Sequence, residues 1–511
     1  MDSTSSSNSV AGGALRVLFV ASECAPYAKC GGLGDVVASL PKALRQLGAD
    51  ARVVLPLYAG IDCEQFGLHP AGPLAVMVGT GERFSCEVWE ATAPGGVPVA
   101  FIAHESFFGR AGIYNDPGGE GYSDNAERFG LLCFAAMALC EARGFAPDIA
   151  HVHDWPTAIL PALLTARRPA AFAHTRTVLT IHNEAYQGYS PASALPFLGL
   201  PSSFFVPDVL EAYGQLDLLK GGIVLADAVT TVSPTYAREI LAEPAACGLA
   251  AQLAARARDP ARFRGILNGA DYDIWNPAAD PALPAAFDLP DPDPGKLACK
   301  LDLQRALGLA PAASTPLYGI VCRLTPQKGM ALLIDLLDPL LAEMRLQLAL
   351  LGNGDPDLEN AFRDAAHRHP HAIAAHIGYS DALAHRIQAG SDFFLMPSLF
   401  EPCGLAQLYA LRYGTLPIVH ATGGLADTIE QYDETTGDGT GFKFDNPAPC
   451  ALHDAIGWAN STYFDRPAHF AAMRRRAMAR RFDWTTAARH YLDLYRTLLV
   501  PPATTPRPLA P

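Results

Sequence analysis

Residues 16–44 read RVLFVASECAPYAKCGGLGDVVASLPKAL, and this stretch decides the fold class. The apolar run 16–21 is typical of a β-strand. After a loop with two adjacent glycines, the apolar spacing predicts a helix over 35–47. A second apolar run at 52–57 predicts the next strand. Strand, helix and strand in this order form a βαβ unit, so the sequence predicts an α/β fold with a parallel sheet.

The same alternation continues along the chain and is interrupted once. Residues 276–296 hold six prolines and four aspartates, a composition that excludes a helix or a central strand there. Apolar runs predict further strands on both sides of it: 99–103, 149–153, 178–182 and 228–233 before, and 317–322, 346–351, 373–378, 393–397 and 417–420 after. Because 511 residues are also too many for one core, we expect two α/β domains in series.

The interruption sets the expected domain boundaries. We predict an N-terminal Rossmann-like domain over 15–275, a linker over 276–296 and a C-terminal Rossmann-like domain over 297–480. A helix within 481–500 is expected to pack back on the first domain. The Ser- and Gly-rich start, 1–14, and the Pro-rich end, 501–511, are predicted to be disordered.

The composition argues against several functional classes. The formal net charge of −14 disfavours binding to nucleic acid or to an anionic membrane surface. Eleven scattered cysteines without a C-x-x-C pair indicate reduced thiols rather than a disulfide framework. The longest apolar helix candidate, 131–140, is too short to span a bilayer, and the N-terminus lacks the features of a signal peptide. We therefore expect a cytoplasmic protein with no nucleic-acid and no membrane partner.

A glycine turn occurs twice, as KCGGLGD at 29–35 and as TGGLAD at 422–427. Each copy lies between a predicted strand and a predicted helix. Glycine lets the main chain approach a ligand, and the N–H groups of a helix start suit phosphate oxygens. A tight turn that begins a helix without any ligand would have the same sequence, so these turns alone leave the question of binding open.

Polar residues follow strands in both predicted domains. Arg323 and Lys328 lie on a Pro-containing loop, where they could clamp a diphosphate or be two solvated surface cations. Glu401 lies between a strand and a helix, where it could accept hydrogen bonds from sugar hydroxyls or be an ordinary acid of a helix start. In the first domain, HVHDW at 151–155 and TIHNE at 180–184 end strands, at the edge where open α/β sheets bind ligands.

Metal binding is a weaker interpretation of the same residues. His151 and His153 alternate on a strand, but no third ligand has suitable spacing. Three D-x-D triplets, at 271–273, 291–293 and 355–357, would suit a metal-dependent transferase, yet such triplets arise by chance in an acidic chain. We expect no metal and no cofactor.

Taken together, the motifs resemble the bacterial glycogen synthase and plant starch synthase family, which are retaining glucosyltransferases that use ADP-glucose. The matching stretches include KCGGLGDVVASLPKAL, YSDNAERF, HVHDW, TIHNEAYQG, TVSPTYAREI, CRLTPQKG, PSLFEPCGLAQLYAL and TGGLADTI. They extend from Lys29 to Ile429, and the lysine–GGL turn combined with FEPCGL and TGGL is specific. The resemblance implies the GT-B fold: two Rossmann-like doubly wound domains facing across a cleft that holds the active site.

The resemblance also implies residue roles. Around the reacting bond it implies Glu401, His182, Arg323, Lys328 and Asp154. For binding ADP-glucose it implies Lys29, Gly31, Gly32, Asn268, Tyr379, Thr422, Gly423 and Gly424, with Tyr379 stacking on the adenine. For the α-1,4-glucan acceptor it implies Trp155, Tyr122 and Asn183. The expected reaction transfers α-D-glucose to the non-reducing 4-hydroxyl of the glucan and retains the α configuration.

Other functions stay open on the sequence. A different GT-B transferase, such as a maltose-1-phosphate synthase or a sucrose-type synthase, would share the Arg and Lys pair. A glycogen phosphorylase would need a lysine for pyridoxal phosphate, of which the sequence has no signature. A non-catalytic protein that binds nucleotide sugars would keep the same charged positions. The sequence does not determine the oligomeric state.

Overall fold

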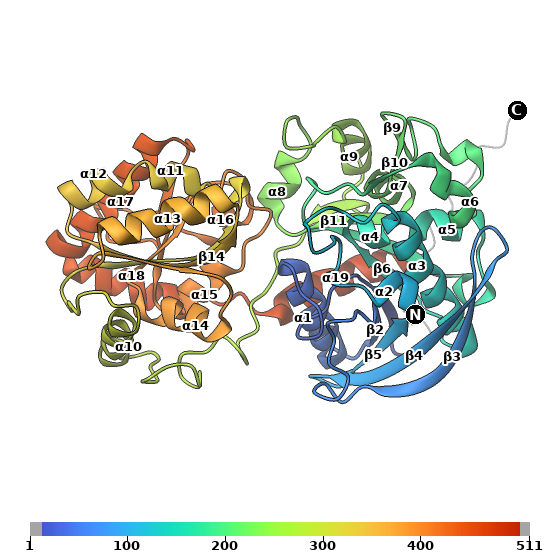
Figure 1. Ribbon diagram of the computed structural model, residues 1–511, viewed down its shortest axis with the longest axis horizontal. Coiled ribbons are helices and arrows are strands. Elements are labelled where there is room, and N and C mark those ends of the chain that lie inside the picture. Colours follow the sequence, from blue (N-terminus) through green and yellow to red (C-terminus); the bar gives the residue numbers. More distant parts are fainter. Residues whose placement is uncertain (1–12, 501–511) are drawn as a thin grey trace, which may run out of the picture. The chain divides into compact units, whose positions relative to one another are not determined.

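The structure is a computed structural model that describes residues 13–500, and it divides into two compact α/β units (Figure 1). Unit 1 consists of Met1–Thr230, Ile240–Arg264 and Ala487–Pro511, and unit 2 of Thr231–Glu239 and Gly265–Thr486. The tails expected to be disordered fall outside the described residues, apart from positions 13 and 14. The structure thus changes unit at Gly265, ahead of the predicted linker, and returns to unit 1 at Ala487.

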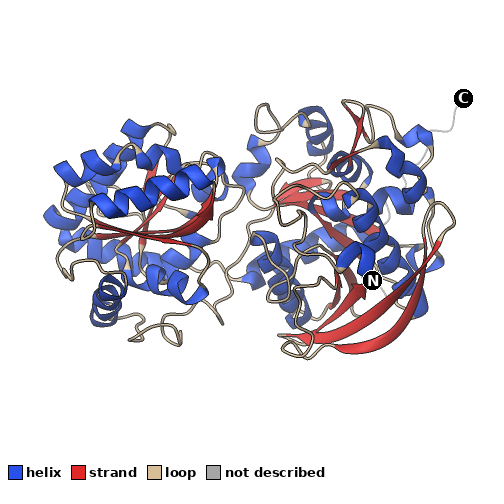
Figure 2. Cartoon of the chain, in the orientation of Figure 1, coloured by secondary structure: helices blue, strands red, loops and turns tan. Residues whose placement is uncertain are grey.

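Unit 1 is built on a nine-stranded sheet with the order β12-β11-β7-β6-β1-β2-β5-β4-β3. Figure 2 draws the strands of both units in red and the helices that surround them in blue. The strands of the nine-stranded sheet are β1 (Arg16–Val20), β2 (Asp50–Pro56), β3 (His69–Met77), β4 (Arg83–Ala93), β5 (Val97–Ala103), β6 (Ile149–His153), β7 (Arg176–Ile181), β11 (Ala228–Thr231) and β12 (Phe263–Gly265). Strand β1 pairs in parallel with β2 and β6, and β2 pairs in parallel with β5. The order from β5 to β11 is therefore the 3-2-1-4-5-6 arrangement of a Rossmann fold.

The helices of unit 1 follow the apolar spacing of the sequence. They are α1 (Gly32–Gln46), α2 (Glu105–Phe108), α3 (Asn125–Ala142), α4 (Asp154–Thr157), α5 (Leu160–Ala166), α6 (Leu195–Leu198), α7 (Leu218–Leu225), α9 (Ala250–Ala257) and α19 (Trp484–Leu499). Helix α1 begins where Gly31 is extended, and its apolar face buries Val36, Leu40 and Leu44. Helix α19 lies against β6, because the Tyr495 hydroxyl is 2.7 Å from His151 Nδ1.

Two antiparallel strands of unit 1 have no counterpart among the expected strands. β4 pairs antiparallel with β5, and β3 pairs antiparallel with β4 at the end of the sheet. β3 contains Pro70, Gly72 and Pro73, which disfavour a strand on sequence grounds. An edge strand tolerates proline because one side of its backbone has no neighbour to donate to. A further small sheet joins β8 (Tyr189–Ser190), β10 (Gln215–Asp217) and β9 (Glu211–Ala212).

Unit 2 is built on a six-stranded parallel sheet with the order β15-β14-β13-β16-β17-β18. Its strands are β13 (Leu317–Leu324), β14 (Gln347–Gly354), β15 (Ile373–Ile377), β16 (Phe393–Met396), β17 (Leu416–His420) and β18 (Phe442–Phe444). This order is again 3-2-1-4-5-6, so both units have the doubly wound topology that the sequence predicts. The first five strands lie within a few residues of the expected positions, and β18 was not expected.

Helices cover the sheet of unit 2 on both faces. They are α8 (Pro234–Glu239), α10 (Asp293–Ala306), α11 (Met330–Ile334), α12 (Leu337–Glu343), α13 (Pro356–Arg368), α14 (Asp381–Gly390), α15 (Ala406–Arg412), α16 (Gly423–Thr428), α17 (Pro449–Asp465) and α18 (Pro467–Ala479). Four 3₁₀ helices complete the described elements: η1 (Ala170–Phe172), η2 (Ala192–Ala194) and η3 (Ser202–Phe204) in unit 1, and η4 (Pro326–Lys328) in unit 2.

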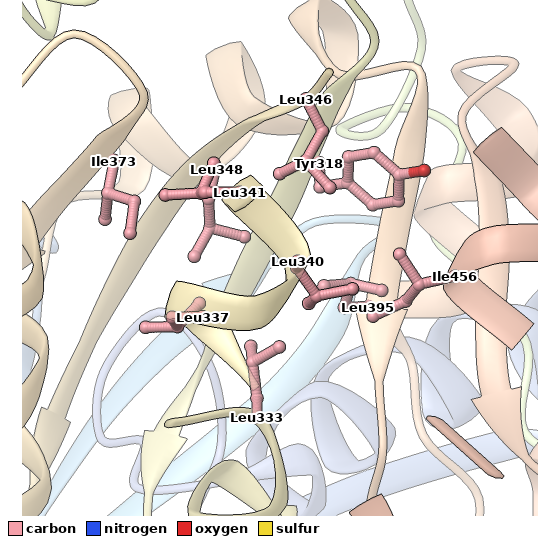
Figure 3. Close-up of a pocket in the computed structure, with 10 residues that line it drawn as sticks. All are labelled: Tyr318, Leu333, Leu337, Leu340, Leu341, Leu346, Leu348, Ile373, Leu395 and Ile456. Atoms are coloured by element: carbon pink, nitrogen blue, oxygen red, sulfur yellow. The ribbon is translucent and has the colours of Figure 1, made fainter. Parts of the chain in front are cut away.

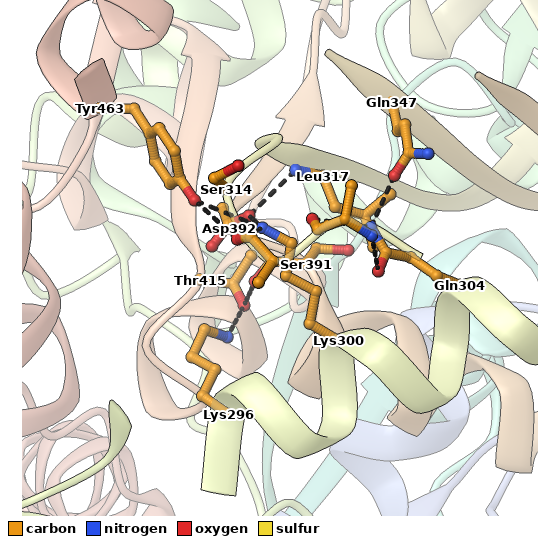
Figure 4. A network of polar contacts seen from close by, with 12 residues as sticks. Lys296, Lys300, Gln304, Ser314, Leu317, Gln347, Ser391, Asp392, Thr415 and Tyr463 are labelled. Atoms are coloured by element: carbon orange, nitrogen blue, oxygen red, sulfur yellow. Dashed lines mark hydrogen bonds and ion pairs between the residues drawn. The ribbon is translucent and has the colours of Figure 1, made fainter. Parts of the chain in front are cut away.

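The expectation that 276–296 contains no helix is wrong at its end. Helix α10 begins at Asp293, with Pro294 in its first turn, where the missing N–H would have no helical partner. The helix is anchored by two buried lysines (Figure 4). Lys300 pairs with Asp392 at 2.6 Å, and Lys296 donates to the Thr415 hydroxyl at 2.7 Å. These contacts join the end of the predicted linker to the core of unit 2.

The core of unit 2 leaves one small apolar cavity beside the sheet (Figure 3). Its lining consists of leucine and isoleucine side chains with one phenol: Tyr318, Leu333, Leu337, Leu340, Leu341, Leu346, Leu348, Ile373, Leu395 and Ile456. A lining with so few polar atoms cannot bind a sugar or a phosphate. The cavity is a packing feature of the core, and the candidate site lies elsewhere.

Candidate active site

Both sheets reverse their strand order at one point, and several of the predicted site residues follow the strands that flank it. A doubly wound sheet binds ligands beyond the carboxyl ends of the two strands that flank this switch point. In unit 1 the flanking strands are β1 and β6, and the segments after them carry Lys29 and Asp154. In unit 2 they are β13 and β16, followed by Lys328 and Glu401. Each unit therefore has its own candidate ligand surface.

An ion pair lies at the switch point of unit 2. Lys328 Nζ is 2.6 Å from Glu401 Oε2, and the two side chains are 17 % and 6 % exposed. The Ser398 hydroxyl donates to the same carboxylate oxygen at 2.9 Å. Since an ammonium group has three N–H donors, the pair holds Lys328 in place and leaves donors for a ligand oxygen. Ser398 belongs to the PSLFEPCGL motif of the sequence, but only the structure shows that its hydroxyl is bonded to Glu401.

Close backbone contacts fix the two loops that carry this pair. Gly329 has a φ of +65°, and a Cβ added to it would lie 2.0 Å from the carbonyl oxygen of Pro397. The N–H of Leu399 donates to the carbonyl of Gln327 at 2.8 Å. Only glycine allows this approach, so the loop after β13 and the loop after β16 are held in one register.

The second glycine turn is occupied by a carboxylate of the chain itself. Glu239 accepts the N–H of Gly423, at 3.0 and 3.2 Å to its two oxygens, and the Thr422 hydroxyl at 3.2 and 3.4 Å. The N–H of Gly424 donates to the carbonyl of Glu401 at 3.0 Å. Phosphate binding would need these N–H groups to face open space, but in the structure they are bound by Glu239 and by the carbonyl of Glu401. The turn instead supports the main chain of Glu401.

Glu239 ends helix α8 and binds the start of helix α16. A second carboxylate, on α16, binds the start of α8. Asp427 of α16 accepts the N–H of Thr235 at 2.8 Å and its hydroxyl at 2.6 Å, at the start of α8. Each helix thus caps the other, which places an acid at each positive helix end. No local sequence signal could show this, because the partners are more than 180 residues apart.

Three further predicted residues of unit 2 differ in their surroundings. Arg323 is exposed at the end of β13 and makes no ion pair with any described residue. Tyr379, just after β15, has 81 % of its surface exposed. Asn268 is buried, and its Oδ1 has no hydrogen-bond partner within residues 13–500. A buried amide oxygen without a partner is costly, so Asn268 is suited to accept a ligand hydroxyl.

Asp154 organises the candidate surface of unit 1. One of its carboxylate oxygens accepts the N–H of His182 at 2.6 Å and that of Asn183 at 3.4 Å. Asp154 also has a φ of +52°, an uncommon conformation for a residue with a side chain. The ends of β6 and β7 are therefore joined through this carboxylate, which brings Asp154, His182 and Asn183 together.

A buried histidine, His153, holds the ring of His182 by a hydrogen bond. His182 Nε2 is hydrogen-bonded to His153 Nδ1 at 3.0 Å, and the His153 ring stacks on Phe19. Burial lowers the pKa of His182 to about 3, so its imidazole is neutral at physiological pH. Burial likewise raises the pKa of Asp154 to about 8, outweighing the lowering effect of the N–H groups of His182 and Asn183. His182 can thus exchange hydrogen bonds with sugar hydroxyls without carrying charge.

This raised pKa makes thermal stability depend on pH. The folded protein disfavours the charged form of Asp154, so ionisation costs stability as pH rises from about 4 to about 8. Asp154→Asn keeps an oxygen for the two N–H groups and cannot ionise. We expect the melting temperature of the variant minus that of the wild type to increase through this pH range and to become constant above pH 8. Melting curves of both proteins at pH 5, 7 and 9 test this, and a constant difference would contradict it.

Lys29 and the first glycine turn are also held by the chain. Lys29 Nζ pairs with Asp35 at 2.7 Å while the lysine side chain remains 43 % exposed. Buried Glu23 accepts the N–H groups of Cys30 at 2.7 Å and Gly31 at 3.1 Å, and the Tyr114 hydroxyl donates to it at 2.6 Å. Glu23 therefore fixes the turn, a role that sequence reasoning missed.

At the start of α1, Gly32 remains exposed. The first N–H groups of a helix have no partner within that helix. Of the two predicted glycines of this turn, Gly32 is therefore the more accessible, since the N–H of Gly31 is bound by Glu23.

The predicted acceptor aromatics are largely occupied by protein. Trp155 packs edge-on against Phe129, and a Cβ on Gly188 would lie 2.5 Å from its ring. The ring of Tyr122 lies under the guanidinium groups of two arginines, 4.6 and 5.1 Å from its centroid. Both predicted acceptor rings therefore pack against protein groups. Other aromatic residues of unit 1, such as Tyr186 and Tyr189, are exposed to solvent.

The remaining expectations concern metals and membranes. Within residues 13–500, no group of three or more His, Cys, Asp or Glu side chains is arranged to hold a metal ion. None of the helices described for this chain has the length and apolar character needed to cross a membrane.

Two doubly wound units with polar residues at both switch points match the GT-B fold, and two family models identify the chain as a glycosyltransferase of this fold. The family model of the starch synthase catalytic domain matches residues 16–255, and that of glycosyl transferases group 1 matches 310–472. A sucrose-phosphate synthase structure from Thermosynechococcus elongatus has a TM-score of 0.58 at 17 % identity, which supports the fold alone.

Closer relatives show the family. Glycogen synthase from Anaeromyxobacter sp. (strain Fw109-5) is 48 % identical over 95 % of this chain and 100 % of its own length. Glycogen synthase 1 from Geobacter sulfurreducens is 45 % identical over 94 % and 96 %. The catalytic domain of Arabidopsis thaliana starch synthase IV, bound to ADP and acarbose, has a TM-score of 0.88 at 35 % identity, with 95 % and 99 % covered. The chain belongs to the glycogen and starch synthase family.

Proposed function

We propose that this glycosyltransferase moves an α-D-glucosyl unit from ADP-glucose to the non-reducing 4-hydroxyl of an α-1,4-glucan and retains the α configuration. The observation that carries the proposal is the Lys328–Glu401 ion pair at the switch point of unit 2, with the exposed Arg323 at the end of β13, just before the loop of Lys328. A diphosphate leaving group needs cations, and a glucosyl group needs hydrogen-bond partners for its hydroxyls.

Charge development in the reaction assigns the cations. When the bond between the anomeric carbon and the diphosphate breaks, positive charge grows on the sugar and negative charge on the departing phosphate. Lys328 and Arg323 neutralise that phosphate, and Glu401 holds Lys328 in position. Lys29 supplies a further positive charge from unit 1, which its exposed ammonium group allows. These groups lower the barrier because they are already in place when the charge develops.

The polar groups of unit 1 bind the transferred glucose and the acceptor. Neutral His182 and Asn183, both held by Asp154, offer hydrogen-bonding groups for sugar hydroxyls. In unit 2, the unpartnered amide oxygen of Asn268 offers one more. The preference for ADP-glucose is assigned to Tyr379, whose exposed aromatic ring suits stacking on adenine. The relative from Arabidopsis thaliana was solved with ADP and acarbose, which supports this donor and a glucan acceptor.

Transfer of labelled glucose tests the proposed donor and acceptor. The purified protein is incubated with radiolabelled ADP-glucose, UDP-glucose or GDP-glucose, each with glycogen or with glucose 1-phosphate. We expect label in glycogen with ADP-glucose, and release of that label by an α-1,4-specific hydrolase. Label in a phosphorylated disaccharide would favour a maltose-1-phosphate synthase. Binding of ADP-glucose without any transfer would favour a non-catalytic protein, and either result would overturn the proposal.

A further inference from the structure

A strained tyrosine is displayed at the tip of a hairpin in unit 1. Strands β9 and β10 are joined by Tyr213 and Gly214, with Ala212 paired to Gln215. Both turn residues have positive φ, +53° for Tyr213 and +77° for Gly214. The Tyr213 side chain is 85 % exposed, the highest value among the large apolar and aromatic residues that the structure describes.

This conformation is expensive for tyrosine. A two-residue hairpin with positive φ at both positions favours Asn-Gly, because asparagine tolerates the left-handed region and bulky side chains do not. The ring of Tyr213 is mostly in water, so burial does not offset this cost. Strained residues of this kind persist where the strained group serves a function. The observation therefore points to a ligand for the exposed ring.

The hairpin is fixed rather than loose. The N–H of Gly214 donates to the Glu211 carboxylate at 2.8 Å across the turn. Lys220 of α7 donates to the carbonyl of Glu211 at 2.7 Å. A Cβ on Gly221 would lie 2.3 Å from the Leu210 side chain, so the helix packs tightly on the base of the hairpin. The ring of Tyr213 is thus presented from a rigid support.

Two more exposed tyrosines belong to the same region. Tyr189 is 45 % exposed and lies on β8, next to β10. Its hydroxyl donates to Gln187 at 2.6 Å, and the Gln187 amide donates to the carbonyl of Cys247 at 2.8 Å. A Cβ on the next residue, Gly248, would lie 3.7 Å from the Tyr213 hydroxyl. The loop at 247–248 therefore lies between Tyr189 and Tyr213 and connects them.

This region continues directly from the candidate active site. The segment 183–189 follows His182, and its third exposed ring is Tyr186, at 51 %. The N–H of Tyr186 donates to the carbonyl of Asn183, whose own N–H is bound to Asp154. Gly188 lies against Trp155. Tyr186 and Tyr189 thus follow His182 and Asn183 on one segment, and Tyr213 lies on the hairpin whose strand β10 pairs with β8. We call these three tyrosines the tyrosine platform.

We propose that the tyrosine platform binds the glucan chain whose end reacts at His182 and Asn183, with the apolar faces of its glucose rings stacked on the tyrosines. The inference rests on the proposed function and names where the acceptor is held. A neutral glucan fits better than a polyanion, because the carboxylate of Glu211 lies at the turn beside Tyr213. Aromatic faces suit a sugar because they bury its C–H groups, while the tyrosine hydroxyls and Gln187 offer polar contacts at the edge.

Tyr213→Asn separates the binding role from a structural one. Asparagine relieves the strain, so we expect the melting temperature to rise by about 2 °C while the ring is lost. Glycogen affinity, measured without donor by retardation in glycogen-containing native gels, is expected to fall about 3- to 10-fold. The KM for glycogen should rise accordingly, with the KM for ADP-glucose and for maltotriose unchanged.

Matched variants complete the test. Phe464→Leu, an exposed ring in unit 2, should leave glycogen retardation unchanged, and Tyr189→Phe, which keeps its ring, should retain most of it. Unchanged retardation of Tyr213→Asn would overturn the platform even if the protein transfers glucose. Retardation that depends on Tyr213 in a protein without transfer activity would instead support the platform and count against the proposed function alone.

Discussion

Lys328→Ala is expected to lower kcat for glucosyl transfer about 100- to 1000-fold, the usual loss when one preorganised partner of a developing charge is removed. Lys328 is held by Glu401 at 2.6 Å, so it does not need to move as charge grows on the departing phosphate. The effect is expected in kcat more than in the KM for ADP-glucose, because the charge on the phosphate is larger in the transition state. Initial rates at saturating glycogen measure it.

The variant also leaves the buried carboxylate of Glu401 without its cation, hydrogen-bonded to the Ser398 hydroxyl. Breaking a buried pair in this way costs roughly 3 kcal/mol, so unfolding must be measured in parallel. Lys328→Met combined with Glu401→Gln removes both charges, and it should recover stability without recovering kcat. Arg363→Ala, which opens an exposed ion pair with Glu359 in the same unit, is the control and should keep full activity. Full activity in Lys328→Ala would refute the assigned role.

Gly329→Ala is expected to be strongly damaging to unit 2. The new methyl group would meet the carbonyl oxygen of Pro397 at 2.0 Å, and alanine disfavours the φ of +65°. Strain and overpacking together cost roughly 2 to 5 kcal/mol. Because Gly329 adjoins Lys328 and Pro397 precedes the loop of Glu401, relief of the clash must separate the ion pair. We therefore expect a lower midpoint of urea unfolding together with a large loss of kcat.

Gly308→Ala separates the two causes. Gly308 has a φ of +73°, close to that of Gly329, yet a Cβ there would have no heavy atom within 4 Å. This variant carries the backbone strain alone, roughly 1 to 2 kcal/mol, and should keep its activity. If the two alanine variants lost the same stability and activity, the contact with Pro397 would not be what holds the two loops.

The sequence by itself determined the repeated doubly wound topology and the strand ends where ligand residues lie. Period and composition carry this information locally. Apolar runs such as 317–322 specify buried strands, and the polar residues that follow such strands include His182 and Lys328. Local signals failed where the fold overrides propensity. β3 forms despite Pro70 and Pro73 because it lies at a sheet edge, and α10 begins inside a Pro-rich segment.

Only the tertiary structure decided how the site residues are held. Both glycine turns suggested free N–H groups, yet Glu23 and Glu239 bind them, the latter from 184 residues away. The exposed tip at Tyr213 was equally invisible, since backbone angles and solvent exposure follow from the assembled hairpin. A sequence states which groups can form hydrogen bonds, whereas the choice of partner depends on which groups the fold brings within 3 Å of one another.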